Sequence, residues 1–230
     1  MVTHTNRPAT SGRDEATTHD GESDREVYDR SSLRGDFMVM IAGQTPEDFE
    51  RFAPESRSCD YIDGIVYMPS PATDRHQDQV GFLFDLLNGF RCERGGGAVR
   101  MGPAVLRLSD QWKPEPDLFV RPGEEAGQPR PPCLLVIEIL SPSTRDHDMG
   151  PKLSVYKASG IPEIWLFDER DRTVIGERRV GDGYRREQRT EGRLDSTALP
   201  GFWLDVVWLW ADPLPNPRRC LERILAGPPA

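Results

Sequence analysis

Residues 134–140, Leu-Leu-Val-Ile-Glu-Ile-Leu, form an apolar run that contains a single acid, Glu138. The length of the run and its β-branched content are typical of a strand that is buried on both faces of a sheet. Side chains alternate along a strand, so Glu138 shares a face with Val136 and Leu140. An ionised carboxylate is costly to bury unless a cation or a metal compensates its charge. The run therefore predicts a central strand with a partner for Glu138 nearby.

Asp117 is the first candidate for the neighbourhood of Glu138. It follows Pro114-Glu115-Pro116 and precedes an apolar segment, so we expect it at the entrance of a strand. If that strand pairs with residues 134–140, both carboxylates can face one cleft, and their oxygens suit Mg²⁺ or Mn²⁺. Two alternatives stay open at this point: Asp117 can be a turn-forming acid, and Glu138 can belong to a structural ion pair.

Lys152 is the second candidate, on a helix predicted over about residues 150–159. Asp148, Lys152 and Tyr156 are spaced i, i+4, i+8 and so lie roughly on one helix face. A lysine held beside two acids can orient an attacking water and stabilise charge that develops on a phosphate. Taken alone, Lys152 is more typical of an ordinary helix surface. Two acids and a lysine around a strand pair indicate metal-assisted hydrolysis of a phosphodiester.

Two upstream residues are additional candidates for the same site. Asp60 begins a hairpin predicted over residues 60–68, where it is either a turn acid or a further cleft carboxylate. His76 lies at the start of a helix predicted over residues 74–91. It is either a capping or core histidine, or else a proton shuttle or substrate contact.

The remaining patterns predict a mixed α/β core with one strand–helix–strand crossover at residues 134–168. Alternating or buried apolar runs predict further strands at 98–101, 104–108, 117–121, 163–168, 172–179, 183–190 and 202–208. The pair at 172–179 and 183–190 is expected to be exposed. Helical signals predict further helices at 45–52 and 218–225.

The length of 230 residues suits one domain with two tails. Residues 1–36 are polar and predict a disordered head. Residues 37–212 are expected to form the domain, and residues 213–230 a proline-rich tail with a short helix. Cys59, Cys92, Cys133 and Cys220 are widely spaced, which favours free thiols over a disulfide or zinc framework.

The net charge of −9 counts against avid, non-specific binding of nucleic acid. The charge is uneven, however, because residues 170–193 hold eight arginines against five acids. No apolar stretch reaches the roughly 18–20 residues that span a membrane, and residues 1–18 do not read as a signal peptide. We therefore expect a cytoplasmic protein without a membrane segment.

These motifs resemble the Uma-two family of restriction endonucleases, within the PD-(D/E)xK nuclease superfamily. The likeness covers about residues 45–210, and its motifs are Pro116-Asp117, residues 136–144, Asp148, Lys152, Tyr156, residues 160–168, residues 60–64 and His76. It implies a restriction-endonuclease-like core, a mixed β-sheet flanked by helices. It also implies metal-binding roles for Asp117 and Glu138 and the catalytic lysine role for Lys152.

Two positions depart from the pattern that this resemblance implies. The superfamily lysine normally lies two residues after the acid, but position 140 is Leu, so Lys152 on the next helix is expected to fill the role. The family usually has Glu where this chain has Asp60, which is shorter by one methylene.

The leading hypothesis is a metal-dependent endonuclease that uses Mg²⁺ or Mn²⁺ and acts on DNA. One alternative is a catalytically silent binding protein on a nuclease fold. The other is a phosphodiesterase that acts on RNA or nucleotides. A homodimer is also expected, because paired clefts suit the cutting of two strands.

Overall fold

The computed structural model describes residues 36–52, 58–95, 97–123 and 131–227. Almost all of the predicted head, and residues 228–230 of the predicted tail, lie outside these ranges. The domain limits proposed from the sequence stay predictions.

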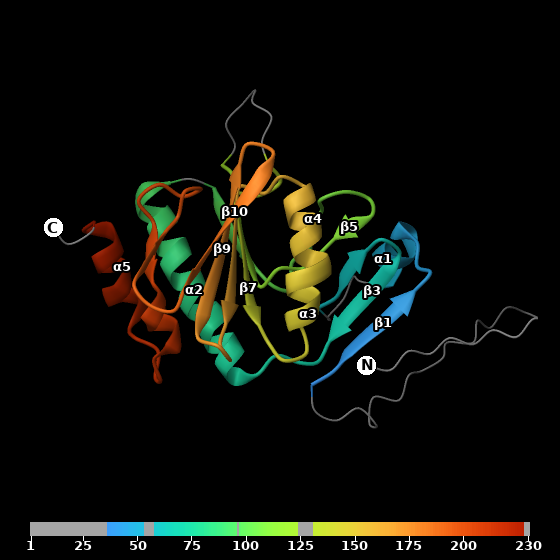
Figure 1. Cartoon of the computed structure of the whole chain (residues 1–230), viewed down its shortest axis with the longest axis horizontal. Helices are drawn as coiled ribbons and strands as arrows, with labels where there is room; N and C mark the ends of the chain where they lie inside the picture. The colour runs from blue at the N-terminus through green and yellow to red at the C-terminus, as the bar shows by residue number, and fades with distance from the viewer. Residues whose placement is uncertain (1–35, 53–57, 96, 124–130, 228–230) are drawn as a thin grey trace, which may run out of the picture.

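A six-stranded mixed sheet forms the centre of the molecule, in the order β10-β9-β8-β7-β6-β4 (Figure 1). Its strands are β4 (Ala98–Met101), β6 (Leu118–Arg121), β7 (Leu135–Leu140), β8 (Glu163–Asp168), β9 (Thr173–Val180) and β10 (Gly183–Arg189). Strands β7 and β8 are parallel, and the other neighbours are antiparallel. The parallel pair confirms the crossover that the sequence predicts.

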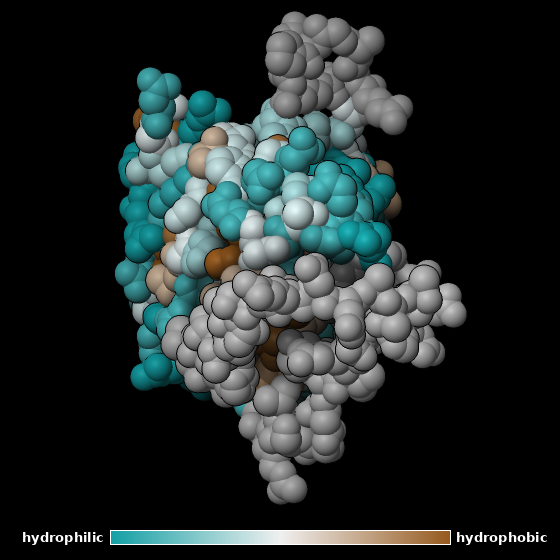
Figure 2. Space-filling model, turned by 90° about the vertical axis from the view of Figure 1, so that its right-hand side faces the viewer, coloured by the Kyte–Doolittle hydropathy of each residue, from teal (hydrophilic) through white to brown (hydrophobic). Residues whose placement is uncertain are grey.

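A second, four-stranded antiparallel sheet has the order β1-β3-β2-β5 and lies on the right in Figure 1. Its strands are β1 (Met38–Ala42), β2 (Asp60–Ile62), β3 (Ile65–Pro69) and β5 (Trp112–Lys113). The predicted hairpin is confirmed as β2–β3. Its turn residues Asp63 and Gly64 both have positive φ, as a tight two-residue turn requires. Where it is not grey, the molecule seen from this side is largely hydrophilic (Figure 2).

The helices divide between the two faces of the six-stranded sheet (Figure 1). The long α2 (Asp74–Arg94), the 3-10 helix η3 (Val206–Trp210) and α5 (Pro217–Leu225) lie on one face. The other face is covered by a continuous helical segment of α3 (Arg145–His147), the π-helix η2 (Asp148–Lys152) and α4 (Leu153–Ala158). The short α1 (Pro46–Phe52) packs with the four-stranded sheet.

Strand β7 is buried along its whole length, as predicted. Leu135 and Ile137 enter the core shared with α2, whereas Val136 and Leu140 enter the core shared with α4. Glu138 therefore faces α4 and its π-helical start, where its partners are found.

Several boundaries differ from the sequence predictions. Residues 104–108 form no strand, although Leu108 and Leu106 donate to the carbonyl oxygens of Trp112 and Pro114. Pro114 has no N–H to return a bond to Leu106, so the ladder is interrupted there. The strand predicted at 202–208 is the short β12 (Trp203–Asp205), paired with β11 (Arg193–Asp195), and it continues into η3. Strands β1, β5 and β11 were not predicted.

Two further predictions need correction. The helix predicted from residue 150 begins at Arg145. The hairpin β9–β10 was expected to be exposed, but residues 173–177 of β9 are buried because β9 is not an edge strand; β10 forms the edge.

Gly97 sits where β4 begins, and its φ is +104°. A Cβ at this position would lie 1.7 Å from the carbonyl oxygen of Arg121, the neighbouring residue on β6. We expect Gly97→Ala to lower the free energy of unfolding by at least about 2 kcal/mol, because backbone strain adds to overpacking. The matched control is Gly181→Ala, at φ +59° with nothing within 4 Å. It should cost only about 1 kcal/mol. Urea unfolding of both variants measures the difference, and equal losses would contradict the clash.

Candidate active site

Glu138 lies at the centre of a buried polar cluster, and its side chain is only 1% exposed. Its Oε1 accepts a hydrogen bond from the Tyr156 hydroxyl at 2.5 Å and pairs with the Lys152 Nζ at 2.8 Å. Burial raises the pKa of Glu138 well above its usual range, against the lowering effect of Lys152 and with a further rise from Asp148 and Asp117. The predicted proximity of Glu138 and Lys152 is therefore confirmed.

Lys152 is buried, and its ammonium has three close oxygen partners. These are Glu138 Oε1 at 2.8 Å, the carbonyl oxygen of Glu115 at 3.1 Å and Asp148 Oδ1 at 3.2 Å. Burial would lower the pKa of Lys152, but the carboxylates around it, Asp60 first, outweigh that effect and raise the pKa well above its usual range. Lys152 thus stays charged in the interior.

The π-helix η2 helps to explain how Asp148 and Lys152 meet. This five-residue segment contains Pro151, which cannot donate a regular helical hydrogen bond. A widened turn accommodates such a residue, and π-turns are frequent at functional sites. Asp148 begins this segment and Lys152 ends it, and their side chains meet on one side. Tyr156 follows on that side one turn later. The shared helix face that the sequence predicts is therefore confirmed.

Asp117 is the most exposed of the contacting acids, at 24%. It lies directly before β6, and its Oδ2 accepts a 2.7 Å hydrogen bond from the Ile139 amide on β7. Its own amide points at Glu138 Oε2, at a distance of 3.3 Å. The antiparallel pairing of β6 with β7 thus brings Asp117 and Glu138 together across the intervening loop. Asp117 faces outward while Glu138 faces inward.

His76 lies beside Asp117 at the start of α2, where the Thr73 hydroxyl caps the helix by accepting a bond from the His76 amide. Its Nε2 is 3.2 Å from Asp117 Oδ2. Burial tends to lower the pKa of His76, but the bond to Asp117 raises it overall. His76 and the Ile139 amide of β7 therefore contact the same oxygen of the Asp117 carboxylate.

Asp60 reaches the same cluster from β2. Its Oδ1 accepts a 2.6 Å hydrogen bond from the Glu115 amide and lies 3.8 Å from the Lys152 Nζ. Its Oδ2 lies 2.7 Å from His147 Nε2. Burial opposes the charge of Asp60, yet Lys152 and His147 lower its pKa overall. The geometry makes Asp60 a buried member of the cluster and not a turn acid.

Two members of the cluster were missed from the sequence, Glu115 and His147. The Glu115 carboxylate accepts from the Cys59 amide at 3.2 Å, and burial together with Asp60 raises its pKa to about 7. His147 stacks on Tyr67 with ring centroids 4.1 Å apart. Glu115 lies two residues before Asp117, and His147 lies one before Asp148. This closeness in sequence to Asp117 and Asp148 is the signal that could have pointed to Glu115 and His147. Many residues outside the cluster are equally close to a candidate, so the signal is weak.

The donor set fits a divalent cation. Five carboxyl groups converge here, those of Asp60, Glu115, Asp117, Glu138 and Asp148. Lys152 contacts three of them, Asp60, Glu138 and Asp148. Glu138 Oε2 accepts a 3.3 Å hydrogen bond from the Asp117 amide, which places this oxygen beside the residue that carries the most exposed acid. Within the described ranges, no three His, Cys, Asp or Glu side chains form a ready-made metal site. A Mg²⁺-like ion commonly takes one or two carboxylates and completes its shell with water and substrate phosphate.

The arginines of the β9–β10 hairpin are mostly engaged within the protein. Arg178 pairs with Glu163 at 3.3 Å and with Glu187 at 2.6 Å. Arg186 pairs with Glu177 at 2.6 Å. These arginines compensate buried acids of β8 and β9, so the local excess of positive charge is largely structural.

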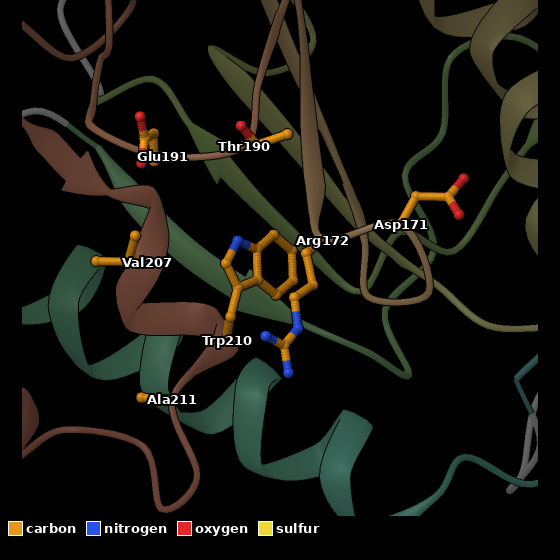
Figure 3. Close-up of a pocket in the computed structure, with 7 residues that line it drawn as sticks. All are labelled: Asp171, Arg172, Thr190, Glu191, Val207, Trp210 and Ala211. Carbon is orange, nitrogen blue, oxygen red and sulfur yellow. The ribbon is translucent and has the colours of Figure 1, made fainter.

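A separate surface pocket of about 470 Å³ lies among the β8–β9 turn, the segment after β10 and η3 (Figure 3). It is lined by Asp171, Arg172, Thr190, Glu191, Val207, Trp210 and Ala211. None of these residues belongs to the acidic cluster, so Glu191 supplies a control position outside the site.

A mixed sheet flanked by helices, with acids at adjoining strands and a lysine on the next helix, defines a restriction-endonuclease-like α/β protein. A solved structure supports this fold. A crystal structure of a putative nuclease belonging to DUF820 from Anabaena variabilis ATCC 29413 matches with a TM-score of 0.58 and 19% identity, over 72% of this chain and 97% of that chain. No curated protein matches this sequence.

Residues 46–207 match the Uma-two family, described as "Putative restriction endonuclease". The chain belongs to this family, which confirms the resemblance drawn from its motifs. In the described part of the chain, no helix has both the length and the apolar character needed to cross a membrane. All four cysteines are free.

Proposed function

We propose that this protein is a metal-dependent endonuclease that hydrolyses phosphodiester bonds in DNA. The observation that carries the proposal is the junction of Asp117, Glu138 and Lys152. The open Asp117 is joined through its amide to Glu138, whose other carboxylate oxygen holds Lys152 at 2.8 Å. Membership of a nuclease family supports nucleic-acid chemistry at this junction.

Asp117 and Glu138 are the residues that would hold Mg²⁺ or Mn²⁺. Such an ion supplies Lewis acidity, which lowers the pKa of a bound water and offsets charge on a phosphate. The protein's own contribution is preorganisation. His76 and the Ile139 amide fix Asp117, whereas Lys152 and Tyr156 fix Glu138. In the reaction, a water would lose a proton to solvent as its oxygen bonds to phosphorus, while the bond from phosphorus to the leaving deoxyribose oxygen breaks and that oxygen takes up a proton from solvent.

The test is a cleavage assay with supercoiled, linear and single-stranded DNA, each in Mg²⁺ and in Mn²⁺. We expect nicking that needs the metal and is lost in EDTA. Asp117→Ala should reduce the rate at least about a hundredfold, because it removes one of two carboxylates from a preorganised charged site. Glu191→Gln, which removes a carboxylate from the separate pocket, should cut at the wild-type rate.

The remaining outcomes separate the alternatives. Cleavage of RNA or of a nucleotide phosphodiester, with DNA left intact, would assign the site to another phosphodiester. Binding of DNA without turnover in either metal would favour a silent binding protein. Equal rates for Asp117→Ala and the wild type would remove Asp117 from the site. The homodimer and the cytoplasmic location stay predictions.

A further inference from the structure

His147 contacts the acidic cluster, although it is neither a proposed metal ligand nor the proposed catalytic lysine. It lies at the end of α3, directly before the π-helix that carries Asp148 and Lys152. Its side chain is buried and reaches across to β2, where Nε2 lies 2.7 Å from Asp60 Oδ2. His147 therefore ties the start of the π-helix to the four-stranded sheet.

Asp60 passes this constraint on to Lys152 by two routes. Its Oδ1 lies 3.8 Å from the Lys152 Nζ, close enough for direct electrostatic attraction. The same Oδ1 accepts a 2.6 Å bond from the Glu115 amide, and the carbonyl oxygen of Glu115 in turn accepts from Lys152 at 3.1 Å. Asp60 Oδ1 thus places negative charge beside the Lys152 ammonium and also holds the Glu115 backbone, whose carbonyl oxygen binds that ammonium.

Asp60 can play this part only while its second oxygen is satisfied. His147 is its partner there, and the ring of Tyr67 holds the imidazole in place by stacking at 4.1 Å. Without the Nε2 donor, a buried carboxylate loses a charge-assisted hydrogen bond, and such groups move toward the nearest remaining donor. The nearest remaining cation is Lys152, so its contact with Glu138 would be strained.

We propose that His147 is a positioning residue that acts through Asp60 to hold the Lys152 ammonium against Glu138. The inference rests on the proposed nuclease function only for its kinetic readout. The hydrogen-bonding partner of His147 is Asp60, and not the proposed metal ligands Asp117 and Glu138.

Two substitutions separate hydrogen bonding from packing. His147→Phe keeps a flat ring on Tyr67 but removes the donor to Asp60. His147→Gln removes the ring but offers an amide N–H near the position of Nε2. We expect His147→Phe to lower kcat about 10–100-fold, as is typical when a partner of a site residue is lost, with KM within about twofold of the wild type. His147→Gln should retain most of kcat.

A second readout does not depend on cleavage. The buried, hydrogen-bonded ammonium of Lys152 should give a slowly exchanging ¹⁵Nζ–H₃⁺ signal by NMR in the metal-free protein, assigned by its loss in Lys152→Met. The signal should persist in His147→Gln and disappear in His147→Phe. Should His147→Phe fail to fold, Asp60→Asn serves instead and should show the same loss.

The outcomes are distinct from those that test the nuclease itself. If the wild type cuts nothing but the NMR pattern holds, the nuclease proposal fails and the positioning role stands. A strong signal and full kcat in His147→Phe, with losses in His147→Gln, would assign His147 to packing alone. If the two variants behave alike, and the NMR signal and kcat are retained in both or lost in both, the role of His147 as a hydrogen-bond donor is also overturned.

Discussion

Glu138→Gln is expected to lower the rate of DNA cleavage at least about a hundredfold while the fold is retained. The amide has nearly the shape of the carboxylate, and its oxygen can still accept from Tyr156. It carries no charge, however, so it can neither attract Lys152 nor hold a divalent cation as strongly. Single-turnover cleavage of a labelled duplex in Mn²⁺ measures the rate, and circular dichroism checks the fold.

Glu163→Gln is the matched control for this experiment. Glu163 is also a buried glutamate, on the adjoining strand β8, but its partners are structural: Ser196, Trp165, Arg178 and the amides of residues 197 and 198. Its substitution should lower the melting temperature and leave the rate per folded molecule unchanged. A full rate in Glu138→Gln, or an equal loss in Glu163→Gln, would contradict the catalytic assignment of Glu138.

Lys152→Met is expected to lower both cleavage and stability. The substitution leaves Glu138, Asp148 and Asp60 buried without their shared cation. Removing one partner of a buried ion pair typically costs about 3–5 kcal/mol. Urea unfolding in EDTA measures this loss without any contribution from bound metal.

The stability loss in Lys152→Met should depend on pH, with a definite sign. Burial already raises the pKa of Glu138 above its usual value of 4.5, and losing Lys152 raises it further. The folded state then holds a proton that the unfolded chain has released, so stability falls as the pH rises above about 4.5. The wild type shares part of this fall, because its own Glu138 pKa is also raised, but Lys152 limits it. The deficit relative to the wild type should therefore be large at neutral pH and shrink as the pH falls and Glu138 becomes protonated in both proteins. A deficit that is independent of pH would contradict this account.

Local patterns in the sequence were sufficient for much of the central architecture. Strands β7 and β8, the β2–β3 hairpin and the long helix α2 all follow from periodicity and from glycine and proline signals. The errors fall where an isolated segment resembles a strand but lacks a partner. Residues 104–108 meet a proline, and residues 206–210 turn into a 3-10 helix against α2. Strand pairing depends on the partner, which local periodicity does not contain.

The candidate site divides in the same way. Regular spacing placed Asp148, Lys152 and Tyr156 on one face, and the apolar run made the burial of Glu138 evident. Glu115 and His147 could not be chosen from the sequence. They enter the cluster because β2, the segment before β6 and the π-helix converge in space, 87 residues apart along the chain in the case of His147 and Asp60.

By itself, the sequence determined that a glutamate would be buried in a central strand, because an apolar run excludes water from both faces. The apolar pattern alone is the same around Glu138 and Glu163; the neighbouring Asp117 and Lys152 and the family resemblance selected Glu138. Only the tertiary structure showed how the surroundings of the two glutamates differ. Glu163 has its charge satisfied by backbone amides, a hydroxyl and an arginine, whereas Glu138 is left facing other acids and a single lysine. The physical reason is that the cost of a buried charge depends on the partners around it, and folding brings those partners from distant parts of the chain.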